Sequence, residues 1–193
     1  KYIEDPDDEI DDSWLSLEYI EEIYEESPEE RKAAANKILG EMKADENDEV
    51  SNERISMVQK IMSMGMKDRV KFAAKGDREA RNVLIRDPNK IVAQAVIKNP
   101  KITEQEVEKI STMKTVPEEV LRIIGMDKKF ARNYGIIHNL ARNPRTPIGN
   151  VISILTRLQL RDLIGIQKNR NVPDAVRKQA QRLVNARTGG KGH

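Results

Sequence analysis

One turn pattern recurs between the short apolar segments of this 193-residue chain and constrains its fold more than any other feature. A basic residue precedes Asn, often followed by Pro, and a Thr or Pro then stands three or four positions before an apolar residue. The pattern occupies 98–103, 142–147 and 168–173, with a weaker copy at 113–117. Asn tolerates the left-handed conformation that ends a helix, Pro cannot continue a helix, and Thr or Pro begins the next one. Many short helices joined by tight turns are therefore expected.

The spacing of apolar residues from Ser51 onward supports this expectation, because it follows a helical period without strand alternation or hairpin turn signals. The turns recur at irregular intervals. We therefore expect an all-α fold: an irregular, right-handed α-solenoid of stacked short helices that bury their apolar faces against their neighbours. The expected helices are 51–64, 66–75, 77–86, 89–98, 103–112, 117–126, 128–142, 147–157, 159–168 and 173–186.

Two segments of the chain resemble known repeat families. The segment 76–100 contains an Asp-Pro turn at Asp87 and Pro88 before its second expected helix, and it resembles a HEAT-type helix pair. The Asn-Pro-x-Thr-Pro turn at 143–147 resembles the leucine-rich repeat variant family. Residues 55–186 together resemble an uncharacterised family of bacterial cytosolic helical-repeat proteins. The HEAT-like resemblance implies a protein-binding scaffold, whereas the cysteine-ligated cluster domain of some variant-repeat proteins cannot apply, because the chain has no Cys.

The charge of the chain is divided unevenly along its length. The net charge is only +2, but residues 1–50 hold five Lys or Arg against 19 Asp or Glu, and residues 51–193 hold 29 against 13. This division predicts an acidic N-terminal helical arm and linker at 1–50, a basic helical repeat domain at 51–186 and a flexible tail at 187–193.

Two helices are expected within the acidic arm. The first covers 13–25, where one apolar stripe is formed by Trp14, Leu17, Ile20 and Tyr24. The second begins at Ser27 and Pro28, a cap and first-turn pair, and extends to about Lys43 with Ala33, Ala34, Ile38 and Met42 on one side. Residues 44–50 form the expected linker.

Catalytic and cofactor signatures are missing from the sequence. The only histidines are His138, among apolar helix positions, and His193 in the Gly-rich tail, and neither has a second ligand at metal-binding spacing. Serines in a nucleophile-elbow frame and Gly-rich phosphate loops are also lacking. We therefore expect a protein that is not an enzyme and holds no metal or cofactor.

The charge distribution is compatible with two functions, and also with a basic surface that has no specific function. The first is a protein scaffold that binds an acidic partner on a basic ridge, formed by residues at equivalent turn positions. The apolar stripe of the arm would then dock on the solenoid or on a second protein, or regulate binding. The ridge residues are Lys98, Arg142, Arg145, Lys168 and Arg170. Alternatively, the basic domain binds nucleic acid through phosphates and the arm covers the site. The third interpretation is a surface with excess Lys and Arg.

Membrane and secretion signals are also lacking. No apolar run approaches the roughly 18–20 residues that a membrane span needs, and no signal peptide is recognisable, so we expect a soluble, cytoplasmic protein. The sequence leaves the oligomeric state open.

Overall fold

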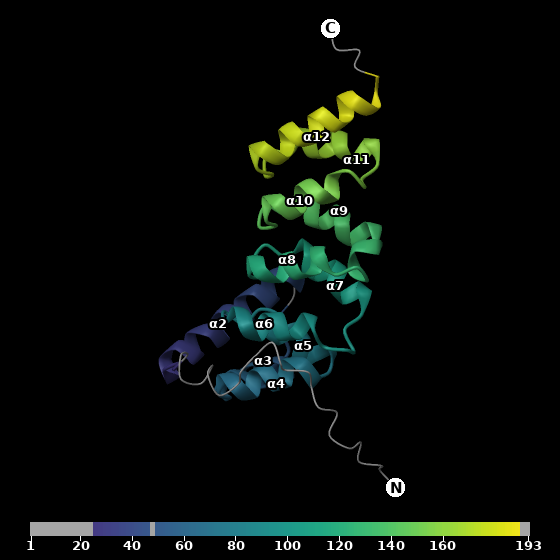
Figure 1. Ribbon diagram of the computed structural model, residues 1–193. Helices are drawn as coiled ribbons and strands as arrows, with labels where there is room; N and C mark the ends of the chain where they lie inside the picture. Colours follow the sequence, from purple (N-terminus) through teal and green to yellow (C-terminus); the bar gives the residue numbers. More distant parts are fainter. Residues whose placement is uncertain (1–24, 47–48, 190–193) are drawn as a thin grey trace.

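The computed structural model describes residues 25–46 and 49–189 (Figure 1). Within these ranges every regular element is a helix and no strand is present, which confirms the all-α class. Nowhere in these ranges is a helix both long and apolar enough to cross a membrane. The elements are α2 (Pro28–Glu46), α3 (Asn52–Ser63), α4 (Met66–Lys75), α5 (Arg78–Leu84), α6 (Lys90–Ile97), α7 (Glu104–Thr112), α8 (Glu118–Met126), the 3-10 helix η1 (Phe130–Arg132), α9 (Tyr134–Arg142), α10 (Ile148–Leu155), α11 (Leu160–Lys168) and α12 (Asp174–Arg187).

From α3 onward, the helices stack in two layers along one long axis (Figure 1). In one layer α4, α6, α8, α10 and α12 each contact the next, and α7, α9 and α11 do so in the other layer, which α3 and α5 begin. Consecutive helices alternate between the layers. The turns after α5, α7, α9 and α11 therefore lie at one edge of the stack, on the left in Figure 1, and the turns after α6, α8 and α10 lie at the opposite edge.

One hydrophobic core runs through both layers and receives side chains from every α-helix described, from Ile38 in α2 to Val184 in α12. Helix α2 belongs to this core although it lies within the acidic stretch of the sequence, and it packs mainly against α3. Ser27 begins α2 as predicted: its Oγ accepts from the Glu30 amide and its own amide donates to Glu30 Oε2 at 2.7 Å. The buried side of α2 differs by one position from the prediction, because Ala35 is buried and Ala33 is exposed.

Buried asparagines connect the turns to helices in the same layer. The Asn99 amide group, after α6, donates to the carbonyls of Ala73 and Gly76 at the end of α4, at 2.9 and 3.1 Å. The Asn143 amide group, after α9, donates in the same way to Ser111 and Met113 at the end of α7, at 2.9 and 3.0 Å. These bonds satisfy carbonyls that a helix end leaves without partners, and they fix the spacing between stacked helices.

The role of these asparagines differs from the one expected. Asn143 and Asn169, which end α9 and α11, have φ values of −80°, so their backbone is extended and not left-handed. Each side chain instead accepts from the amide two residues ahead, at 3.0 Å. Asn therefore shapes the turn through its side chain, as an Asx turn, rather than through its tolerance of positive φ.

Most predicted helices lie within about two residues of the observed ones, but the single helix predicted at 128–142 is wrong. The structure divides this stretch into η1 and α9, with Asn133 between them. The Asn133 side chain accepts from the Ile136 amide at 3.2 Å and caps α9. Because a capping side chain satisfies orphan amides only where the backbone leaves the helix, Asn133 favours a break here.

We predict that Asn143→Ala lowers the free energy of unfolding by about 2–3 kcal/mol, because it leaves two buried carbonyls without donors. The matched control is Asn169→Ala: Asn169 makes the same turn bond but is only half-buried and donates to no carbonyl, so a loss of about 1 kcal/mol or less is expected. Urea unfolding followed by circular dichroism measures both. Equal losses of stability in the two variants would show that the bonds from Asn143 to α7 do not stabilise the stack.

Candidate binding interface

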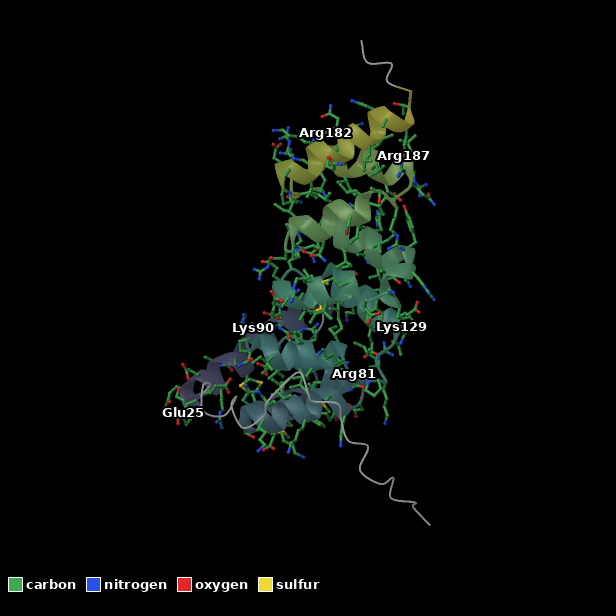
Figure 2. All side chains as sticks on the ribbon, in the orientation of Figure 1. Glu25, Arg81, Lys90, Lys129, Arg182 and Arg187 are labelled. Carbon is green, nitrogen blue, oxygen red and sulfur yellow. The ribbon has the colours of Figure 1, made fainter. Side chains whose placement is uncertain are left out.

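Exposed cations line the edge of the stack that carries the turns after α5, α7, α9 and α11. Each cation lies in one of these turns or directly beside it, so four successive levels of the stack contribute. Figure 2 labels one of them, Lys90, at this edge. We call this group the basic edge; its members are Lys90, Lys114, Arg142, Arg145, Lys168 and Arg170.

None of the six side chains has a hydrogen bond or ion pair with any residue that the structure describes. Two arginines at the opposite edge, by contrast, bind the chain itself. Arg157 donates to the carbonyl of Ala131, and Arg187 donates to the carbonyls of Leu158 and Thr156. Cations without partners repel one another, and an anionic ligand relieves that repulsion.

The structure divides the basic ridge expected from the sequence. Arg142 and Arg145 flank the turn after α9, and Lys168 and Arg170 flank the turn after α11, so these four share one edge. Lys98 lies in the turn after α6, at the opposite edge (Figure 1). The same turn pattern thus occurs at both edges, because one copy leads from the first layer to the second and the others lead back.

The acidic side chains near the basic edge are few. Helices α6 and α10, which begin at this edge, have no acidic residue in their first turns. In α8 Glu119 pairs with Arg122 at 2.6 Å, and in α12 Asp174 pairs with Lys178 at 2.7 Å. The bond from Lys178 holds the pKa of Asp174 below its ordinary value. Apart from the exposed Glu118, the acids at these helix starts are thus already paired.

An apolar patch adjoins the basic edge on α10. Ile148, the first residue of α10, is 43% exposed, and Ile152, one turn later on the same face, is 39% exposed. Arg145 lies three residues before Ile148. Exposed isoleucines one helical turn apart beside unpaired cations suit an amphipathic, acidic ligand better than a uniformly polar one.

The start of α2 is fixed to the stack by a buried arginine. Arg69 in α4 is fully buried and donates to both carboxylate oxygens of Glu26, at 2.7 and 2.6 Å. Its Nε donates to Asp87 at 2.9 Å, and Nη1 also reaches the Met64 carbonyl. Burial disfavours the charged guanidinium, but Glu26 and Asp87 outweigh burial and raise the pKa of Arg69. Removing one partner of such a group leaves an uncompensated buried charge.

Two further arginines complete this buried network. Arg86 binds Asp45 near the end of α2 at 2.6 Å, so both ends of α2 are held by ion pairs. Arg81 in α5 binds both oxygens of Glu106 in α7 at 2.9 Å. Burial tends to raise the pKa of Glu106, but its bonds from Arg81 and Thr103 hold that pKa below the ordinary value. These pairs connect sequence-distant elements, so no local pattern predicts them.

A pocket of about 520 Å³ lies between α2 and the turn after α5. Its wall includes the carboxylates of Glu25 and Glu26, the apolar side chain of Met62, and the turn residues Pro88 and Asn89. Because Lys90 follows Asn89 directly, the pocket adjoins the first cation of the basic edge.

A cluster of Tyr134, His138 and Asp162 connects α9 to α11 at the edge opposite the basic edge. The Tyr134 hydroxyl donates to Asp162 at 2.5 Å and accepts from the Gln159 amide at 2.9 Å, and His138 Nε2 lies 3.7 Å from Asp162. Burial and the bond to Asp162 raise the pKa of Tyr134. With the hydroxyl satisfied at both lone pair and proton, the cluster caps α11 and presents no activated nucleophile.

No group of three potential metal ligands occurs in residues 25–46 and 49–189. The arm stripe of Trp14, Leu17, Ile20 and Tyr24, and the C-terminal His193, lie outside the described residues. Sequence reasoning missed Lys90 and Lys114 as members of the basic edge. The sequence does contain a signal for both: Lys90 follows the Asp-Pro turn at Asp87 and Pro88, and Lys114 lies in the weaker copy of the turn pattern at 113–117.

Comparisons with protein-family models, with curated proteins and with solved structures find no match to this chain. The geometry of the basic edge therefore carries the functional argument.

The buried Asp87 predicts a specific pH dependence. Burial raises its pKa from 3.8 to about 6 against the lowering effect of Arg69. A carboxyl with a raised folded pKa stabilises the folded state fully below its unfolded pKa, and this contribution is lost as the pH rises through about 6. The stability of the wild type should thus rise relative to Asp87→Asn by about 2 kcal/mol between pH 7 and pH 4. Urea unfolding across this range tests it, and parallel profiles would refute it.

Proposed function

We propose that the chain is a HEAT-like α-solenoid scaffold that binds an acidic segment of a partner protein along its basic edge. The observation that carries the proposal is that six exposed cations at four successive levels have no partner among the described residues. The two-layer stack supports the solenoid reading, because each helix packs mainly on its neighbours in the chain and in its layer.

The buried pairs of the same structure strengthen this argument. Arg69, Arg81 and Arg86 each have a carboxylate partner, so the chain supplies acids where its own fold needs them. The basic edge lacks such partners. Successive helices of a layer are about 8–10 Å apart, so the edge is about 30 Å long. A ligand that supplies carboxylates along this length would neutralise the cations at each level.

A protein segment fits this edge better than a single-stranded nucleic acid. Base stacking needs exposed aromatic rings. Among described residues Tyr134 is the one exposed aromatic side chain, and it begins α9 at the opposite edge. The apolar pair Ile148 and Ile152 instead suits the nonpolar face of an amphipathic helix.

The test is the affinity of the full chain for a fluorescent, Glu-rich amphipathic peptide, measured by anisotropy at low salt. Reversing Arg142, Arg145, Lys168 and Arg170 to Glu should weaken binding by about tenfold or more, or about 1.4 kcal/mol. The matched control reverses four exposed cations at the opposite edge, Lys101, Lys128, Lys129 and Arg132, and should change affinity by less than about threefold.

Equal losses in the two quadruple variants would show attraction to net charge alone and overturn the proposal. A mixed-sequence DNA duplex serves as the second probe under the same conditions. Tighter binding of this duplex than of the peptide, with the same dependence on the basic edge, would assign the edge to nucleic acid instead.

A further inference from the structure

Residues 1–24 have the chemistry of the ligand that the basic edge lacks. They contain ten Asp or Glu and one Lys, and their apolar residues include the Trp14, Leu17, Ile20 and Tyr24 stripe. The charge of this segment is thus opposite to that of the basic edge, and its apolar residues could contact the exposed pair Ile148 and Ile152 on α10. The same polypeptide carries both halves of a complementary contact.

The structure shows where this segment joins the stack. Glu25, the first described residue, lines one pocket together with Pro88 and Asn89, and Lys90 follows directly. Figure 2 shows Glu25 and Lys90 on the same side of the molecule. Glu26 is held by the buried Arg69, so the connection is fixed in place. The described fold therefore begins, at Glu25, beside the first cation of the basic edge.

The length of the segment suffices to cover the edge. A chain of 24 residues reaches about 80 Å when extended and about 36 Å as a helix, against about 30 Å from the level of α6 to that of α12. In a helix, the ten residues between Trp14 and Tyr24 would span about 15 Å, or between one and two levels of the stack. A short tether also gives an effective concentration in the millimolar range.

We infer that residues 1–24 pack along the basic edge of their own chain and occupy the surface that an acidic partner would use. The competition with a partner rests on the proposed function: an acidic partner must displace residues 1–24 before it binds, so only a partner of sufficient affinity binds. Contact itself requires only the complementary charges and the position of Glu25. Because the contact is electrostatic and exposed, salt weakens it.

Zero-length carbodiimide crosslinking of the dilute wild-type chain tests the contact, since the reagent joins a carboxylate to a lysine amine as an amide with loss of water. Mass spectrometry should find residues 1–24 joined to Lys90, Lys114 and Lys168, and less often to Lys101, Lys128 and Lys129 at the opposite edge. Equal crosslinking to both edges would refute the inference. An equal mixture of isotopically light and heavy chains separates the cases, because crosslinks within one chain never join a light to a heavy copy. Light–heavy products making up about half of the crosslinks, the share expected for random pairing between copies, would assign the segment to a second molecule and overturn packing within one chain.

Affinity for the Glu-rich peptide tests the competition in the full chain. Neutralising Asp7, Asp8, Asp11 and Asp12 to Asn should raise that affinity by about threefold or more, because the edge becomes easier to reach. The control neutralises exposed acids outside the segment, Glu29, Glu53 and Asp68, and should raise it less. If the peptide binds at the basic edge but the Asn variant binds no more tightly than the control, the inference fails while the proposed function stands. If the peptide binds neither the wild type nor the Asn variant and the crosslinks still form at the basic edge, the proposed function fails and the packing of residues 1–24 stands.

Discussion

The arrangement of this protein depends on buried polar side chains in its turns. Helices of seven to 14 residues from α3 onward are too short to be stable alone, so each needs its neighbours. Apolar packing supplies most of that stabilisation but does not by itself set which helix ends meet. Asn99 and Asn143 do so by donating to carbonyls at the end of a neighbouring helix, and Asp87 does so by accepting from Arg69. A buried carbonyl without its donor is costly, so each bond favours one relative position of the helices.

Turns that are fixed in this way place their flanking residues at the edges of the stack. Cations beside the turns after α5, α7, α9 and α11 therefore gather at one edge, although they are far apart in the sequence. Arg69, Arg81 and Arg86 are buried with carboxylate partners, whereas the cations of the basic edge are exposed without them. The ion pair between Arg69 and Glu26 links the buried pairs to the basic edge, because it fixes the residues that follow the acidic segment 1–24 beside that edge.

Local signals in the sequence predicted the helices well, because caps, prolines and apolar periods act over a few residues. Even so, one capping residue, Asn133, was read as part of a helix. The candidate site was predicted less completely. Lys98 shares its turn pattern with Arg142 and Lys168, but the pattern does not state whether a turn leads into or out of a layer, so it groups Lys98 with residues that lie at the other edge. The carboxylate partners of Arg69 and Arg86 are 18 to 43 residues away, a separation at which sequence spacing has no predictive value.

The central proposal is that acidic ligands bind this chain along its basic edge. Backbone amide shifts of the full, isotope-labelled chain, followed during titration with the Glu-rich peptide, test it directly. We predict that the shifts concentrate at residues 85–90, 113–117, 142–148 and 168–173 and decline as salt is added. Shifts concentrated instead at 98–103, 127–133 and 156–161, the turns of the opposite edge, would contradict the account.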